Sequence, residues 1–514
     1  MLFNLSATLP FQTDRKCTEI KSKLMGVIQR QGIKNVILNY FGLFIGFVNV
    51  LIIQPNYLTK DEVGLLKIMF AFSSLMATFL PMGMNSITTK FFPQFRNPET
   101  RHYGYFGLML IFPLIGFLLI SALLLIFKSY VFQYYEHSKL FTHYFYLLFP
   151  FIFILGFLSV IHSYAFSLLK TTVPSFINEF IIRLTLIGLT MAYYFKLFNL
   201  DSFIYLYVVV YGLQVILVIL YVIWEEKPSL KFDLKYLNTQ NPRAMMKYGF
   251  LLSFAALTSM ALKSLDAIML GHYVSLAVVG VFAIAVMIPT IIEAPLNALD
   301  KIAAPRISNA WLTNNMVEIQ DIYYKSTKYL LLLGGLLFLG ININIQYLYQ
   351  LTAKDYASGV NVVLIISVGT LINMATGLND SILSYSHKYI YLTYMLVLLF
   401  VLAIVNNIIF IPIWGMEGAA FATCLSSFIY NTIKYFYIWK TFKLQPFDKN
   451  TLLTLLLIGA CFGLNYLLPV LHGAIFNILF RSIIVTGVYG LGTYFLNIIP
   501  EYHHLIPFIG KKKG

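Results

Sequence analysis

Apolar runs about as long as a bilayer is thick recur along almost the whole chain, and they limit its fold more than any other feature. A transmembrane helix needs about 20 consecutive apolar residues, and such runs follow one another from residue 33 to residue 498. Charged residues make up 11% of the chain, against about a quarter in soluble proteins. The strands of membrane barrels would instead alternate over short segments. The sequence therefore predicts an all-α polytopic membrane protein.

Hydropathy predicts about fourteen spanning helices. We expect them at residues 33–53, 63–86, 104–127, 143–168, 174–195, 203–223, 248–270, 277–299, 327–350, 359–383, 389–411, 417–439, 451–469 and 475–498.

Lysine and arginine gather on one side of this arrangement. Of the 36 basic residues, only Lys60, Lys128, Lys139, Lys196 and Lys354 fall in the predicted outer loops. Basic residues concentrate in cytoplasmic loops, which also accounts for the net charge of +15 without a nucleic-acid partner. We therefore predict that both termini are cytoplasmic.

A weak internal repeat divides the chain. Val63-Gly64 and Val279-Gly280 each open the second helix of a half, and related halves with a site between them are common in transporters. We predict two six-helix lobes followed by two further helices. The predicted parts are a cytoplasmic tail (1–32, whose residues 1–24 are either disordered or follow a misassigned start), an N-terminal lobe (33–223), a cytoplasmic linker (224–247), a C-terminal lobe (248–439), two additional transmembrane helices (440–499) and a basic cytoplasmic tail (500–514).

The stretch from residue 256 to residue 305 carries charge within apolar surroundings. It contains Lys263, Asp266 and Glu293. Ionisable side chains at membrane depth are costly, so they usually face a bundle interior or a water-filled cavity. We expect these residues to line a polar path through the membrane, with Asp266 and Glu293 as candidates for coupling to H⁺ or Na⁺.

The same stretch predicts a hairpin with one irregular helix. We expect the turn between its two spans at Gly271-His272. Pro289 and Pro295 bracket Glu293, which predicts a kinked or broken helix, and such a break is tolerated only against protein or a cavity.

A second charged pair lies in the fifth span. Glu179 and Arg183 are four residues apart and so share one helix face. Arg183 is either a cationic anchor for a phosphate, which guanidinium binds in bidentate fashion, or half of an internal salt bridge with Glu179. Lys263 and Asp266 present the same choice, and together these four residues form the predicted substrate site. Lys67, Lys434 and Arg481 lie close enough to helix ends that we expect them to snorkel.

Signatures of enzymes are missing from the chain. It contains no GxxxxGK[ST] phosphate loop, no HExxH and no GxSxG. Cys17, Cys424 and Cys461 have no spacing that indicates a disulfide framework or a metal site. We therefore expect no catalysis and no cofactor, with energy supplied by a gradient or by a partner.

Three segments carry a resemblance to a known family. The segment IIFIPIWGMEGAAFAT at 408–423 resembles the glycine-rich turn of the polysaccharide-transport branch of the multidrug/oligosaccharidyl-lipid/polysaccharide (MOP) exporters, through Gly415, Gly418 and the alanines that follow. LDAIMLGHYVSLAVVGVFAIA, with Asp266, resembles the seventh and eighth helices of that family. IQRQGIKNVILNYFG, residues 28–42, is similar to the start of its first helix.

The resemblance implies the MOP flippase fold and an O-antigen type of oligosaccharide flippase in a bacterial inner membrane. Such a protein moves an undecaprenyl-pyrophosphate-linked oligosaccharide from the cytoplasmic to the periplasmic leaflet by alternating access, during lipopolysaccharide or other polysaccharide biosynthesis. Arg183 and Lys263 would then meet the pyrophosphate. Glycosyltransferases and a polysaccharide polymerase would be the protein partners.

Two alternatives stay open. A drug/cation antiporter of the same superfamily (MATE-like) would be expected to carry a membrane carboxylate in its N-terminal half. The first span has none, although Glu179 leaves the option open. A membrane glycan polymerase or ligase would be an enzyme with a sizeable external loop, and the predicted outer loops are short.

Overall fold

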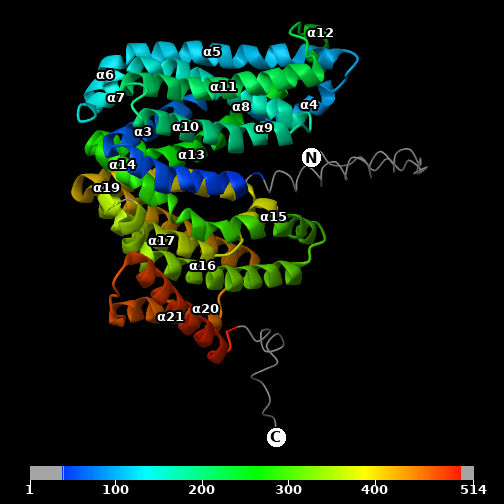
Figure 1. The fold of residues 1–514 in the computed structure, drawn as a ribbon. Helices are drawn as coiled ribbons and strands as arrows, with labels where there is room; N and C mark the ends of the chain where they lie inside the picture. The colour runs from blue at the N-terminus through cyan, green and yellow to red at the C-terminus, as the bar shows by residue number, and fades with distance from the viewer. Residues whose placement is uncertain (1–37, 39, 353, 499–514) are drawn as a thin grey trace.

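The computed structural model describes residues 38, 40–352 and 354–498 (Figure 1). Every element in this part of the chain is helical. The predicted all-α fold is therefore confirmed. The predicted tails at 1–32 and 500–514, with their expected cytoplasmic location, lie outside the described residues, as does Cys17.

The first span is Tyr40–Tyr57, which contains η1 (Asn49–Ile53) and α2 (Gln54–Tyr57). It is followed by α3 (Lys60–Ala77), α4 (Met84–Phe95), α5 (Tyr105–Ile126), α6 (Lys128–Tyr134), α7 (Lys139–His143), α8 (Leu148–Ser167), α9 (Thr172–Phe176), η4 (Ile177–Ile182), α10 (Arg183–Tyr194) and α11 (Leu200–Glu226). The remaining main helices are α12 (Leu234–Thr239), α13 (Pro242–Tyr273), α14 (Leu276–Met287), α15 (Thr290–Leu312), α16 (Met316–Thr352), α17 (Val360–Ala375), α18 (Asn379–Tyr385), α19 (Ile390–Phe442), α20 (Lys449–Leu464) and α21 (Ala474–Phe495).

Local sequence explains where several helices begin. Thr59 and Glu62 form a reciprocal capping box at the start of α3, with Glu62 N donating to Thr59 Oγ1 at 3.3 Å and Thr59 N donating to Glu62 Oε2 at 2.8 Å. Asp448 and Thr451 form a second capping box at the start of α20, and the Asn199 side chain caps α11 by accepting from Ser202 N. These side chains satisfy donors that a helix end leaves without an intrahelical partner.

Eleven helices in the described residues are long and apolar enough to cross a membrane, and the bent pair α14–α15 makes twelve. The predicted count of fourteen is not confirmed by this criterion. One difference is α3, which is not among these spans and whose 18 residues include Lys60, Asp61, Glu62 and Lys67. The other is α19, which the criterion counts once.

Helix α19 is a hairpin rather than one rod. At about 1.5 Å per residue, its 53 residues would extend for about 80 Å, far beyond an apolar core of about 30 Å. Gly415 has φ 59° and ψ −126°, a conformation that only glycine adopts without strain. Asn406 Nδ2 donates to Ser426 Oγ at 2.9 Å, although the two residues would lie about 30 Å apart along a straight helix. The chain therefore reverses at Gly415.

The charged hairpin differs from the prediction at its turn. Helix α13 continues through Gly271 and His272 to Tyr273, and Ser275 caps α14 by accepting from Val278 N at 3.4 Å. The predicted turn at Gly271-His272 is therefore wrong. The expected break is confirmed, because α14 and α15 meet at a bend of 45° beside Pro289.

The linker predicted at 224–247 and the segment between the predicted spans 277–299 and 327–350 are mostly helical. Helix α13 begins at Pro242, α15 extends to Leu312, and α16 begins at Met316. Hydropathy detects the apolar part of a helix, so it misses turns that continue beyond that part.

The helices lie side by side in a stack of layers (Figure 1). In this view, α5 and α11 lie at the top, α3, α13 and α14 near the middle, and α20 and α21 at the bottom against α16.

The two glycines of the sequence repeat lie where α3 and α14 cross. A Cβ on Gly64 would lie 1.8 Å from the Leu276 carbonyl oxygen, and one on Gly280 would lie 2.2 Å from the Lys60 carbonyl oxygen. Only glycine permits α3 and α14 to approach each other this closely. The predicted lobe boundaries stay a prediction.

Arg481 does not snorkel, contrary to the prediction. Its side chain is 4% exposed and donates to the carbonyl oxygens of Asn465, Leu468 and Pro469 at 3.0, 3.1 and 3.3 Å. These carbonyls follow the end of α20, where a helix leaves acceptors without intrahelical donors. Arg481 therefore ties α21 to the end of α20.

Candidate functional site

A cavity of about 520 Å³ lies between the first span, α3, η4–α10, α11 and α14. Much of its lining is apolar and aromatic, with Phe70, Tyr207 and Tyr211 among the rings. Its polar side chains besides the tyrosines are Asn49, Gln54, Lys67, Asn178, Arg183, Thr190 and Thr290. Within the described chain, both charged lining residues are cationic.

Arg183 and Glu179 form an ion pair at the edge of this cavity. Arg183 Nη2 lies 2.7 Å from Glu179 Oε2, and Arg183 Nη1 donates to the Gly42 carbonyl oxygen. Asn178 Nδ2 donates to Glu179 Oε1 at 2.7 Å, and Gln214 Nε2 donates to Asn178 Oδ1 at 2.8 Å. The Arg183 side chain remains 28% exposed, on the cavity side. The predicted salt bridge is therefore present, and it still leaves the guanidinium accessible to a ligand.

Two π-helical turns border the cavity. One is η1 on the first span, and the other is η4, which carries Asn178 and Glu179. π-turns inside α-helices occur frequently at functional sites. Asn49 lies in the first of them, and its Oδ1 is buried with no hydrogen-bond partner among the described residues. Buried polar atoms are nearly always paired, so Asn49 offers an acceptor to a ligand in the cavity.

Glycines on the first span make room for this ion pair. A Cβ on Gly42 would lie 2.2 Å from Glu179 Oε2, and one on Gly46 would lie 2.1 Å from Arg183 Nη1. The two glycines are four residues apart and so share one helix face.

We expect Gly46→Ala to displace the Arg183 guanidinium and to lower transport several-fold. The matched control is Gly188→Ala on α10, where an added Cβ meets nothing within 4 Å. Transport by the two variants, at equal amounts of inserted protein, checks this expectation. Equal transport by both would show that the position of Arg183 does not matter.

Lys67 is the second cation of the cavity, and the prediction that it snorkels is wrong. Its side chain is exposed toward the cavity, whereas its neighbours Leu66 and Ile68 are buried. Lys67 follows Val63 by four residues and precedes Phe70 by three, and all three line the cavity. This helical spacing was a signal in the sequence that could have placed Lys67 on the cavity face.

Asp266 lies on α13, within electrostatic range of Lys67. Its carboxylate accepts hydrogen bonds from Asn407 Nδ2 and Thr423 Oγ1, both at 2.9 Å. These two donors come from opposite arms of the α19 hairpin, so the turn at Gly415 brings them to one carboxylate. Asn407 Oδ1 is buried and has no hydrogen-bond partner among the described residues.

The structure separates Lys263 from Arg183. Lys263 is exposed on α13 and does not line the cavity that contains Arg183. It lies within electrostatic range of Glu293 on α15, which accepts a hydrogen bond from Asn373 Nδ2 at 3.4 Å. The residues predicted to form one site thus belong to three neighbouring groups: Arg183 with Glu179, Asp266 with Lys67, and Lys263 with Glu293.

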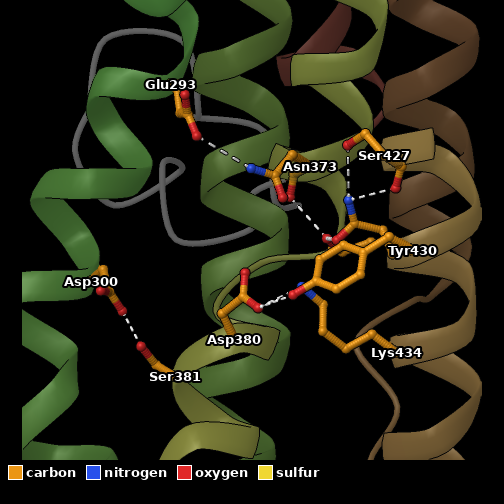
Figure 2. Close-up of polar contacts among 10 residues, drawn as sticks. Glu293, Asp300, Asn373, Asp380, Ser381, Ser427, Tyr430 and Lys434 are labelled. Carbon is orange, nitrogen blue, oxygen red and sulfur yellow. Dashed lines mark hydrogen bonds and ion pairs between the residues drawn. The ribbon is translucent and has the colours of Figure 1, made fainter. Parts of the chain in front are cut away.

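A further polar cluster joins α15, α17, α18 and α19 (Figure 2). Lys434 Nζ lies 2.7 Å from Asp380 Oδ1, and Tyr430 donates to the same oxygen at 3.0 Å. Ser381 donates to Asp300 across the interface with α15. Lys434 is 0% exposed, so the prediction that it snorkels is wrong. Its ammonium holds α18 against α19.

We expect Asp380→Ala to destabilise the protein by about 1–3 kcal/mol, because it leaves the Lys434 ammonium buried without its carboxylate. Asp380 is itself partly exposed, which limits the cost. Thermal unfolding of the purified protein measures the change. Adding Lys434→Met is expected to recover part of the loss, and no recovery would contradict this account of the pair.

Comparison with known proteins identifies the family. Residues 29–311, more than half of the chain, match the family described as polysaccharide biosynthesis protein (Polysacc_synt). No curated protein matches the sequence. Solved structures with a similar fold include two transporters. The lipid II flippase MurJ in an inward closed conformation has a TM-score of 0.70 at 15% identity, covering 92% of this chain and 99% of that chain. An inward-facing multidrug resistance MATE family transporter of the MOP superfamily has a TM-score of 0.59 at 15% identity, covering 79% and 94%. The chain belongs to the polysaccharide biosynthesis protein family within the MOP superfamily of membrane transporters and flippases.

Proposed function

We propose that this protein is a flippase for lipid-linked oligosaccharides. Its substrate would be an undecaprenyl-pyrophosphate-linked glycan of the O-antigen class, moved from the cytoplasmic to the periplasmic leaflet of a bacterial inner membrane by alternating access. The observation that carries the proposal is the cavity lined by Arg183 and Lys67 in a fold of this family. Cations held at membrane depth suit an anionic substrate, and guanidinium matches the geometry of phosphate oxygens.

The charge of the cavity favours this function over export of cationic drugs. In the described residues, no carboxylate lines it. Glu179 is already paired with Arg183 and hydrogen-bonded by Asn178, so it offers little to a cationic ligand. A cationic drug would therefore meet like charge, which disfavours its binding.

Asp266 is the strongest candidate for coupling transport to a H⁺ or Na⁺ gradient. Its carboxylate, the unpaired Asn407 Oδ1 and the Thr423 hydroxyl place three kinds of oxygen together, and hard cations take oxygen ligands. Lys67 lies nearby, so a change of charge on Asp266 would alter the field at the substrate cavity. Glu293 is a second candidate, with Lys263 as its electrostatic partner. Glycosyltransferases and a polymerase acting on the same glycan are the expected protein partners.

Complementation tests the function in cells. A strain lacking its own glycan flippase is supplied with the wild type, Arg183→Ala, Lys67→Ala or Lys263→Ala, with membrane insertion measured for each. We expect the wild type to restore surface glycan, and the Arg183 and Lys67 variants to fail while inserting normally. Lys263→Ala distinguishes two possible substrate sites. It should retain function if the site is the cavity lined by Arg183 and Lys67, and it should fail if Arg183 and Lys263 form the site. Failure of the wild type with every glycan, together with ion-dependent export of cationic dyes, would favour the antiporter.

A further inference from the structure

A groove rich in hydroxyl side chains, with the amide of Asn85 among them, runs between α4, α8 and α13. It consists of two hollows of about 400 and 710 Å³. Asn85, Ser86 and Ser159 line both hollows, which therefore lie next to each other along the groove. Phe70 lines the first hollow and also the cavity that contains Arg183. The groove thus leads away from the cationic cavity toward the end of the bundle where α4 ends.

The groove offers many hydrogen-bond acceptors and little charge. Its hydroxyl residues include Ser86, Thr89, Ser159, Ser163 and Ser253. Several of these hydroxyls donate to backbone carbonyls of helices. Ser163 donates to the Asn85 carbonyl oxygen at 2.9 Å, and Ser159 donates to the Gly156 carbonyl oxygen at 2.8 Å. Each hydroxyl oxygen can still accept from a ligand. Such a lining suits a ligand that carries many hydroxyl donors.

Two polar atoms in the groove are left without partners. Asn85 Oδ1 and His162 Nε2 are shielded from solvent and have no hydrogen-bond partner among the described residues. Buried polar atoms in native proteins nearly always have a hydrogen-bond partner, so a ligand in the groove would supply the partner that these two atoms lack. His162 also stacks on Phe166, with ring centroids 5.7 Å apart, and Tyr248 lines the same hollow. Flat rings beside polar groups are suited to the apolar and hydroxylated faces of a sugar.

We propose that this groove is the glycan subsite of the transporter, and the assignment rests on the proposed function. The anionic pyrophosphate lies at Arg183 and Lys67, and the attached oligosaccharide extends past Phe70 along α4, α8 and α13. Arg96 is the charged lining residue of the described groove, and it lies in the hollow farther from the cationic cavity. The sugars nearest the pyrophosphate therefore contact neutral hydrogen-bonding groups. Such a lining favours uncharged sugars in the hollow next to the cationic cavity.

Ser86 provides the sharpest test because it lines both hollows and makes no hydrogen bond to another helix in the described part of the chain. Ser86→Leu fills the groove without breaking a contact between helices. Thr89→Leu is the second variant, since the Thr89 hydroxyl bonds only within its own helix, to the Asn85 carbonyl oxygen. Ser259→Leu is the matched control, an exposed position on α13 that lines neither hollow.

The measurement is binding to the purified full-length protein in lipid nanodiscs. One probe is sugar-free undecaprenyl pyrophosphate, and the other is lipid-linked glycan extracted from membranes of the source organism. We expect wild type to bind the glycan-bearing probe about ten-fold more tightly, as two or three additional hydrogen bonds would give. Ser86→Leu and Thr89→Leu should remove this advantage and leave binding of the sugar-free probe unchanged. Arg183→Ala should weaken binding of both probes, and Ser259→Leu neither.

The outcomes separate the glycan subsite from the proposed function. Equal binding of both probes by the wild type would overturn the subsite and leave the pyrophosphate site standing. Equal weakening of both probes by the groove variants would show that the groove is structural, which also overturns the subsite. Binding of neither probe by the wild type would overturn the proposed function and the subsite with it.

Discussion

Replacing Arg183 with alanine is expected to reduce glycan transport by about ten- to a hundred-fold, because a hydrogen bond to a charged group contributes about 1.5–3 kcal/mol. The guanidinium faces the cavity while its other nitrogen–hydrogen groups bond to Glu179 and to the Gly42 carbonyl. Loss of the cation removes the group best suited to a phosphate. Initial rates of lipid-linked glycan movement in proteoliposomes, at matched protein content, measure the effect.

The control separates substrate binding from the unpairing of Glu179. Arg183→Ala leaves Glu179 with one hydrogen bond from Asn178 in place of its ion pair. The double variant Arg183→Ala/Glu179→Gln removes that isolated charge and is expected to stay as inactive as the single variant. Recovery of wild-type transport by the double variant would mean that Arg183 serves only to neutralise Glu179, and the pyrophosphate role would be lost.

Gly64→Leu is expected to abolish transport, because α3 and α14 can no longer cross at their present separation. Even a Cβ at this position would lie 1.8 Å from the Leu276 carbonyl oxygen, a backbone atom that cannot rotate away. Overpacking typically costs about 1–3 kcal/mol, and a larger side chain here also separates two helices that line the Arg183 cavity. Thermal unfolding and transport are measured together.

Gly64→Ala and Gly459→Ala form a matched pair for this prediction. Both glycines lie inside helices, but an added Cβ at Gly459 meets nothing within 4 Å. We expect Gly64→Ala to lower both stability and transport, while Gly459→Ala changes neither by much. Similar behaviour of the two variants would contradict a tight crossing at Gly64.

The fold class followed from patterns that act locally along the chain. A long apolar run requires a helix in a bilayer, so the helical architecture was predictable without a partner for any helix. The break beside Pro289 was also predictable from local sequence. Proline removes a backbone donor and clashes with the preceding turn. The spacing of Glu179 and Arg183 likewise predicted that they would share a helix face, and their ion pair is present.

The failures concern residues whose surroundings come from distant segments. Lys434 was expected to snorkel because it lies near a helix end, but it forms an ion pair with Asp380, 54 residues earlier in the chain. Arg481 was expected to do the same, but the carbonyls after α20 bind it. Lys67 lines a cavity whose other walls lie on the first span, α10, α11 and α14. Position along one helix cannot reveal which other helices pack against it.

The most direct test of the flippase proposal is movement of a lipid-linked glycan across a membrane that contains only this protein. Proteoliposomes carry a fluorescent undecaprenyl-pyrophosphate glycan prepared from the source organism, and an impermeant reagent bleaches the label in the outer leaflet. The proposal predicts that the bleached fraction rises with the amount of wild-type protein and not with that of Arg183→Ala/Glu179→Gln. Bleaching that stays at the level of empty liposomes, while the same vesicles transport a cationic dye along an ion gradient, would contradict it.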